Sequence, residues 1–193
     1  MIYDVLNKLL KELQTYLMAV TPPVNITESN IALNNVALVD SSDAANDIHN
    51  HHVIISLVNI EEESSLKNGL HYRRTPIGGI EYENPPVYLN LYLLFTANFP
   101  NNYNSSLVLL GLIIQCFQGQ NSFTIASDEG ELQLTLDLYT MTFEQINHLW
   151  GSLGGKQIPF VMYKARLVRI TDRRLKGTGS PIIEILSESY PNL

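Results

Sequence analysis

The fold is decided by the stretch Pro85-Pro86-Val87-Tyr88-Leu89-Asn90-Leu91-Tyr92-Leu93-Leu94-Phe95-Thr96-Ala97. After the two prolines, the residues alternate with the period of two that is typical of a β-strand. One predicted face is wholly apolar and consists of Val87, Leu89, Leu91, Leu93 and Phe95. The other face is amphipathic and aromatic and consists of Tyr88, Asn90, Tyr92, Leu94 and Thr96. Because Pro86 lacks an amide hydrogen and fixes the strand start, we expect residues 87–96 to form the central strand of a sheet.

Three other segments have the pattern of helices. Residues 2–20 place their apolar side chains on one helical stripe, and Pro22-Pro23 ends the element. Residues 107–117 are apolar nearly all round, which predicts a helix that its own sheet or a neighbouring subunit buries on most sides. Gly111 lowers the helix propensity there by about 1 kcal/mol relative to alanine, so we expect close backbone packing at this position. Thr142 is expected to cap a short helix over residues 143–149.

Further strands are expected on both sides of the central one. Their ranges are 31–39, 53–60, 70–82, 132–138, 159–167 and 182–186. The range 70–82 is interrupted by Gly78-Gly79, which suggests one arm of a hairpin. These elements predict an α/β (α+β) fold, in which a mixed β-sheet is flanked by helices. The length of 193 residues suits one domain that covers residues 1–193.

Composition narrows the classes of partner. The formal net charge of −7 argues against nucleic acid as the main partner, because phosphate binding needs a basic surface. The single Cys116 excludes an internal disulfide. Met1 leads directly into an amphipathic pattern without the features of a signal peptide. No apolar run reaches the ~18 residues of a membrane span, so we expect a soluble protein without a cleaved leader.

The search for catalytic groups finds no complete constellation. The one metal-like cluster is Asp47-Ile48-His49-Asn50-His51-His52, whose side chains could bind zinc or nickel. No second group of ligands lies at a useful distance, which favours a solvated loop or an interface. Cys116 lies in an apolar helix without nearby charge, which predicts a buried, inert thiol. We therefore predict no cofactor, no bound metal and no enzymatic activity.

Charge is unevenly distributed along the chain. The acidic run Glu61-Glu62-Glu63 predicts a strand end that projects into solvent. Positive charge gathers late, on the expected strand 159–167 and in the loop that follows it. Its members there include Lys164, Arg166, Arg169, Arg173 and Arg174. This segment is either a solvated face or a docking surface for an acidic protein partner, where such charges mainly set register and association rate.

Several segments together resemble a known protein family. They are residues 53–63, Asn84-Pro85-Pro86-Val87 through Ala97, Tyr103 with Leu109-Leu110-Gly111, Leu149-Trp150, and Pro159-Phe160-Val161-Met162-Tyr163. Their order and spacing are similar to the N-terminal domain of the Pvc16 family, formerly a domain of unknown function. Members of that family are cap, or tube-terminator, proteins of phage-tail-like contractile injection systems. Asn-Pro-Pro followed by the alternating strand is the most specific part, and some relatives carry a further C-terminal extension.

The resemblance implies a tail-terminator-like single domain that assembles into a homohexameric ring. Such a ring closes the end of the inner tube farthest from the baseplate and contacts the last tube ring and the last sheath layer. It implies a structural protein rather than an enzyme. It also implies assembly in the bacterial cytoplasm, followed by incorporation into a particle that can be released from the cell.

One further contact and two rival functions remain open. The expected strand 182–186 is a candidate to accept an extended sheath segment by strand addition, through Ile183 and Ile185. The nearer rival function is a terminator or completion protein of a true contractile phage tail. The farther one is a metal-dependent enzyme that uses His49, His51 and His52.

Overall fold

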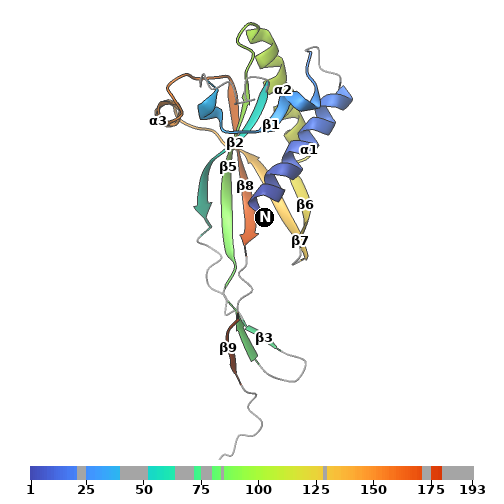
Figure 1. The fold of residues 1–193 in the computed structure, drawn as a ribbon, viewed down its shortest axis with the longest axis vertical. Coiled ribbons are helices and arrows are strands. Elements are labelled where there is room, and N and C mark those ends of the chain that lie inside the picture. Colours follow the sequence, from blue (N-terminus) through green and yellow to red (C-terminus); the bar gives the residue numbers. More distant parts are fainter. Residues whose placement is uncertain are drawn as a thin grey trace, which may run out of the picture.

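The computed structural model describes residues 1–20, 25–39, 52–63, 72–74, 80–83, 85–127, 130–170 and 175–179. Within them, the helices are α1 (Ile2–Val20), η1 (Glu28–Asn30), η2 (Val36–Leu38), α2 (Tyr103–Gly119) and α3 (Phe143–Ser152). The strands are β1 (Ile31–Leu33), β2 (Val53–Glu62), β3 (Tyr72–Arg74), β4 (Ile80–Glu83), β5 (Val87–Ala97), β6 (Ser122–Ser127), β7 (Gly130–Leu138), β8 (Phe160–Ile170) and β9 (Leu175–Gly179). Figure 1 shows their arrangement, which is the α+β fold that the sequence predicts.

The larger sheet is mixed, with β5 in its interior. Its six strands follow the order β1-β2-β5-β8-β7-β6. β1 pairs with β2 in parallel, and the other neighbouring pairs are antiparallel. The prediction that residues 87–96 form the central strand is confirmed, because β5 is flanked by β2 and β8. An irregularity between Leu89 and Leu91 shifts the register, so that Leu89 pairs with Val168 and Leu91 with Ala165.

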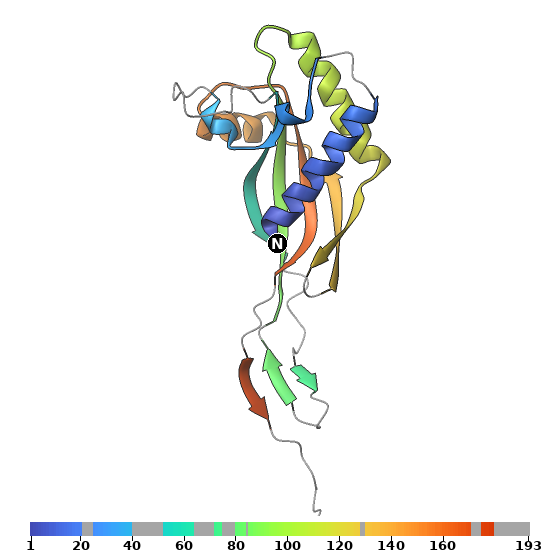
Figure 2. The ribbon, with the colours of Figure 1, turned by 45° about the vertical axis from the view of Figure 1, so that its right-hand side comes forward.

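The smaller sheet continues the three central strands of the larger one. It has the order β3-β4-β9 and is antiparallel. Along the chain β3 follows β2, β4 precedes β5 and β9 follows β8, so both sheets keep the same order of segments. In Figures 1 and 2 the smaller sheet lies beyond the ends of β2, β5 and β8 along the long axis of the molecule.

The two faces of the larger sheet carry separate cores. Helices α1 and α2 pack on one face, where Leu9, Leu13, Leu93, Phe95 and Phe117 belong to one large cluster of buried side chains. Helix α3 lies on the other face, where a smaller cluster consists of Val36, Ile54, Leu94, Trp150 and Met162. Figures 1 and 2 both place α3 across the sheet from α1 and α2. Period two in β5 therefore fills both cores from one strand.

The expected strand 31–39 is shorter in the structure, because an asparagine side chain interrupts it. β1 ends at Leu33, and the side chain of Asn35 accepts a hydrogen bond from the amide of Ala37 at 3.1 Å. This local bond starts η2 and competes with continued strand pairing. The range 70–82 is expected as a single strand and one arm of a hairpin, whereas the structure has two antiparallel strands there, β3 and β4.

Two strands were not expected from the sequence. β6 has six residues, and only two of them, Phe123 and Ile125, are buried at alternating positions. Two positions are too few for the period of a strand to be recognised in the sequence. β9 includes Gly177 and Gly179, which are residues that ordinarily disfavour strands. The expected strand 182–186 lies outside the described residues.

Candidate protein interface on the sheet

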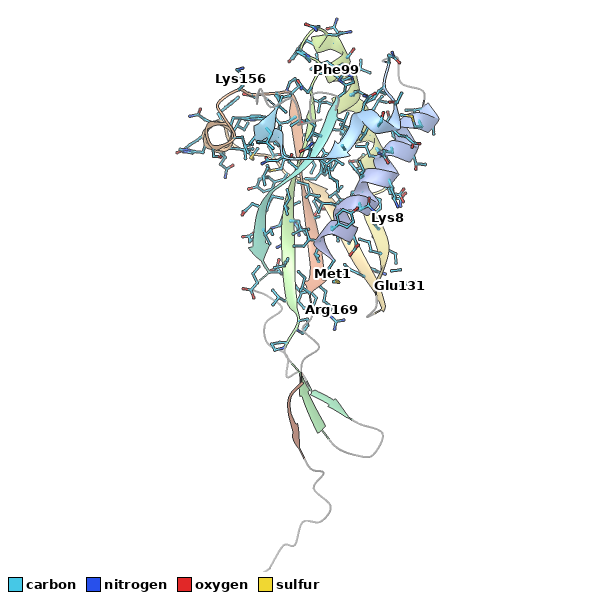
Figure 3. All side chains as sticks on the ribbon, viewed as in Figure 1. Met1, Lys8, Phe99, Glu131, Lys156 and Arg169 are labelled. Carbon is cyan, nitrogen blue, oxygen red and sulfur yellow. The ribbon has the colours of Figure 1, made fainter. Side chains whose placement is uncertain are left out.

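Among the described residues, α3 covers only part of its side of the larger sheet, and the rest of that side carries a set of polar side chains, some of them exposed and some buried. We call this set the polar sheet face. Its members are Glu61, Glu63, Asn90, Tyr92, Asp137, Lys164, Arg166 and Arg169. Figure 3 labels Arg169 at the end of β8 nearest the smaller sheet, whereas Phe99 and Lys156 lie at the opposite end of the larger sheet. Arg169 therefore lies toward the smaller sheet, whereas Tyr92 packs against the cluster that contains Trp150 of α3.

Strand register brings three of these side chains into one cluster. Tyr92 on β5 pairs directly with Lys164 on β8, and Glu61 projects from the neighbouring β2. The hydroxyl of Tyr92 donates to Oε2 of Glu61 at 2.6 Å, and Nζ of Lys164 lies 3.3 Å from the same oxygen. The ammonium group of Lys164 also lies 5.2 Å from the centre of the Tyr92 ring, within the range of a cation–π contact. The ring of Tyr92 in turn meets Tyr139 edge-on at 5.0 Å.

This cluster changes the acidity of its members. The hydrogen bond from Tyr92, followed by the hydrogen bond and charge of Lys164, lowers the pKa of Glu61. The same bond to Glu61, together with burial, raises the pKa of Tyr92. For Lys164, burial is the largest single effect and lowers the pKa, but hydrogen bonds and charges of Tyr92 and Glu61 outweigh it. The pKa of Lys164 is therefore raised, and the ion pair persists at neutral pH.

The remaining charges of the polar sheet face are also largely balanced. Nε of Arg166 lies 2.8 Å from Oδ2 of Asp137 on the adjacent β7. Among the described residues, the buried Nε of Arg169 and the buried Oδ1 of Asn90 lack a hydrogen-bond partner. Nδ2 of Asn90 donates to Glu63 at 3.0 Å.

Among the described residues, the predicted basic docking surface therefore also contains acidic side chains. Lys164 and Arg166, which the sequence analysis assigned to it, each face an acidic side chain that strand pairing supplies. Arg173, Arg174, Ile183 and Ile185 lie outside the described residues. Glu61 was expected to be a solvated strand end, and nothing in the local sequence indicates its contact with Lys164. Only the register of three strands reveals it.

The predicted histidine cluster is described only at His52. Its ring stacks on Phe99 with a centroid distance of 4.4 Å, and Nδ1 lies 3.3 Å from the carbonyl oxygen of Asn98. His49 and His51 lie outside the described residues. Among those that the structure describes, no group of three or more His, Cys, Asp or Glu side chains could hold a metal ion.

The single cysteine behaves as the sequence predicts. Cys116 is a free thiol that is 8% exposed on the inner side of α2. Burial, with a smaller effect from Glu12, raises the pKa of this thiol to about 11. A thiol that remains protonated at neutral pH is a poor nucleophile, which agrees with the expectation of an inert side chain.

Comparison with known proteins assigns the class. The family model described as the Pvc16 N-terminal domain matches residues 4–184, so the chain belongs to the Pvc16 N-terminal domain family. The resemblance that the sequence indicates is thereby confirmed. No curated protein matches the chain. None of the helices in the described ranges has the length and apolar character needed to span a bilayer.

Two solved structures share the fold. One is the PVC sheath/tube terminator of an extracellular contractile injection system in the extended state, with a TM-score of 0.65 and 14% identity. The other is the tube-terminating cap of the anti-feeding prophage, with a TM-score of 0.58 and 14% identity. The alignments cover 100% and 97% of this chain, respectively. The chain spans 64% of the first protein and 61% of the second.

Proposed function

We propose that this protein is a structural cap that terminates the inner tube of a contractile injection system and anchors its last sheath layer. The observation that carries this proposal is the family match over residues 4–184, together with a fold shared with two tube terminators along nearly the whole chain. The sheath and tube proteins of the same particle are the partners. The proposed assembly is a ring of six subunits, formed in the cytoplasm and then carried in the particle.

The proposed role is not enzymatic. A tube built of stacked rings has an unsatisfied interface at its growing end, and a terminator must cover that interface without presenting a new one. This role requires shape and surface complementarity rather than reacting groups. If the polar sheet face takes part in docking, its charged side chains would contribute specificity and association rate more than affinity.

Electron microscopy of particles from cells that lack the gene tests the proposal. Particles with scattered or abnormal lengths, or tubes with detached sheath, are the expected result. Particles of normal and uniform length would refute the terminator role. Reintroduction of the wild-type gene, which should restore uniform length, is the control for effects on neighbouring genes. Particles that contain a phage head and show the same defect would favour the rival assignment to a true phage tail.

The contacts on the polar sheet face need a test that separates docking from folding. Arg166→Glu removes the partner of Asp137 and reverses one surface charge, so it affects both. The double variant Asp137→Arg/Arg166→Asp restores an ion pair with the charges exchanged. If the face docks on the tube or sheath, both variants should weaken attachment, more at low than at high salt. Lys11→Glu on the far side, on α1, is the matched control.

Two predictions concern residues outside the described ranges. We propose that Arg173 and Arg174 contribute to docking on an acidic tube or sheath surface and that the segment with Ile183 and Ile185 accepts a sheath strand. Ile183→Pro should then weaken sheath attachment while leaving tube binding intact, because proline cannot donate to a strand ladder. Unchanged sheath attachment would count against strand addition.

A further inference from the structure

Strand β6 forms one edge of the larger sheet, and its outer side is open (Figure 1). The amide of Leu136 on β7 donates to the carbonyl of Asn121 at 2.7 Å, which fixes the alternation of the ladder between β6 and β7. The backbone groups of Ser122, Thr124 and Ala126 therefore point away from β7, and all three residues are exposed. No hydrogen bond from another described residue reaches these outward amides and carbonyls.

The edge at β6 lacks the features that usually block pairing with another chain. Natural edge strands are guarded by charged side chains, by proline or by a bulge. The six residues of β6 include no charge and no proline, and β6 pairs with β7 without a shift of register. The opposite edge is guarded, because β1 has three residues and Nε2 of Gln14 donates to the carbonyl of Ile31 at 3.0 Å. Of the two edges, β6 is therefore the one suited to accept a strand.

A hollow lies beside this edge, on the side of the helices. Its volume is about 410 Å³, and it lies between α1, the end of α2 and the start of β6. Most of its surface is apolar, and Tyr16, Ala19, Cys116 and Phe123 belong to its lining. An apolar cavity of roughly 150 Å³ holds a benzene ring, so the hollow has room for an aliphatic side chain of a docked strand.

The polar side chains of the hollow leave its apolar character intact. Glu12 pairs with Lys8, and the hydroxyl of Thr15 donates to the carbonyl of Lys11, so both are satisfied within α1. Gln120, which follows α2, is the third polar side chain in the lining. The hollow therefore suits an uncharged, apolar group.

A strand added to β6 would direct every second side chain toward the helices. Residues of the added strand that lie opposite Phe123 and Ile125 would point to that side, where opposing side chains approach most closely. The occupant is therefore an extended segment with apolar residues at alternate positions. β6 of a second copy does not qualify, because Phe123 and Ile125 are 3% and 8% exposed and already belong to their own core.

The segment 182–186 of the chain has the required pattern. It lies outside the described residues, and its sequence is Ile182-Ile183-Glu184-Ile185-Leu186. In an extended chain Ile183 and Ile185 share one side, and Glu184 lies on the other. Its length is close to that of β6, and the apolar side chains on both sides of Glu184 favour burial against another surface.

The chain leaves the smaller sheet in a direction that keeps this segment from β6 of the same subunit. Gly179, the last residue of β9, pairs with Ile80, the first residue of β4, and β4 leads toward β5. β9 therefore runs away from the larger sheet, as Figures 1 and 2 show. β9 carries the chain ~15 Å in that direction. The residues between Gly179 and the segment can span only ~10 Å, which is too short for a return.

We propose that residues 182–186 of one subunit add as a strand to β6 of the next subunit. Ile183 and Ile185 then face Phe123 and Ile125 beside the hollow, and Glu184 lies opposite Thr124 on the solvent side. The two surfaces differ, so the contact is head-to-tail, the type that closes into rings. The other edge of the docked segment stays free, which is compatible with the sheath strand proposed above.

This contact rests on the proposed function only for closure into a ring, and its existence is tested on the purified chain alone. Two variants, Thr124→Cys and Glu184→Cys, are oxidised separately and as a mixture. Directly opposed residues of this kind lie ~5.5 Å apart between Cα atoms, which suits a disulfide. Burial raises the pKa of the Cys116 thiol to about 11 and keeps it out of the reaction. Glu144→Cys, at an exposed position on α3, replaces Glu184→Cys in the control mixture.

The mixture of Thr124→Cys and Glu184→Cys should give a disulfide-linked dimer, whereas each variant alone and the control mixture should not. A dimer from Thr124→Cys alone would replace the proposal with a two-fold contact between β6 strands. A test mixture without cross-links would overturn it, and so would a wild-type chain that sediments as a monomer at all concentrations.

Two further variants measure the contact by sedimentation. Thr124→Pro should raise the dissociation constant of the oligomer at least about tenfold, because it removes an outward donor and leaves its acceptor unpaired. The fold should persist, since the amide of Thr124 does not pair with β7 and proline is tolerated at such edge positions. Thr124→Val keeps the amide and should assemble like the wild type. Ile183→Ser/Ile185→Ser should weaken assembly at least about 100-fold, because two apolar side chains lose their burial.

Circular dichroism separates lost assembly from lost folding in these variants. Wild-type assembly of Thr124→Pro, or of Ile183→Ser/Ile185→Ser, would refute the contact. If both variants stay monomeric, and particles from cells without the gene are normal, the contact stands and the cap function fails. If both assemble normally, and gene deletion gives particles of scattered length, the cap function stands and the contact fails.

Discussion

Replacement of Leu94 by alanine tests whether α3 is packed on the sheet. Leu94 is fully buried on the α3 side of β5, against Ile54, Trp150 and Met162. Removal of a buried leucine side chain costs roughly 2–5 kcal/mol, and the cost rises with the cavity that remains. The core on this side is small, and partly buried neighbours such as Leu149 and Phe160 can move inward. We therefore expect a loss of about 3 kcal/mol, in the lower half of that range.

Urea unfolding followed by circular dichroism measures this loss. The midpoint should fall without a change in the slope of the transition, because the surface exposed on unfolding is nearly the same. For a chain of this length, about 3 kcal/mol corresponds to a fall in melting temperature of roughly 6–12 °C. Protein concentration must be low and constant, since self-association would add to the apparent stability.

Val87→Ala is the matched control on the same strand. Val87 is 41% exposed, so its truncation should cost less than about 1 kcal/mol. A loss for Leu94→Ala that is no larger than this control would refute the packing of α3 on the sheet.

Three smaller effects follow from the same structure. Cys116 should react with iodoacetamide at pH 8 about 100-fold more slowly in the native protein than in urea, and equal rates would contradict its burial. Gly155→Ala should destabilise by about 1–2 kcal/mol because φ is +85°, whereas Gly151→Ala, in open space on α3, should stabilise by about 0.5–1 kcal/mol. Equal signs in urea unfolding would refute this pair. The lowered pKa of Glu61 adds stability that is present above its ordinary pKa of 4.5 and is lost as pH falls through the folded value. Glu61→Gln should therefore lose less stability than the wild type from about pH 6 to about pH 3, and an equal loss in urea unfolding would contradict the contribution of Glu61.

The spacing of apolar residues predicted the helices and strands in which buried positions recur with one regular period. The stripe of residues 2–20 gave α1 with its observed bounds, and the alternation of residues 87–96 gave β5. The position of β5 inside the sheet could also be predicted, because its length and its alternation without a break are typical of a central strand. Local chemistry decided the misses. Asn35 ends β1 early through its own hydrogen bond, and β9 forms despite its glycines because β4 supplies a partner.

The candidate site was harder to predict than the fold. Lys164 and Arg166 belong to a basic run in the sequence, and Glu61 belongs to an acidic run far from it. Their pairing depends on the register of β2, β5 and β8, which includes an irregularity that no local pattern encodes. For α2, the sequence indicated only that the helix has more apolar residues than one buried side needs. Which side faces outward depends on where the sheet lies.

The central place of β5 has a consequence for synthesis of the chain. Its partner β2 precedes it, but its partner β8 is made much later, since Val87 pairs with Ile170. Until β8 has left the ribosome, β5 keeps one long and mostly apolar edge without hydrogen bonds, and such edges readily join those of other chains. Contacts this distant in sequence also slow folding. The protein is proposed to assemble with its own copies in a ring. Aggregation through the edge of β5 therefore becomes less favourable once β8 is complete and pairs with that edge.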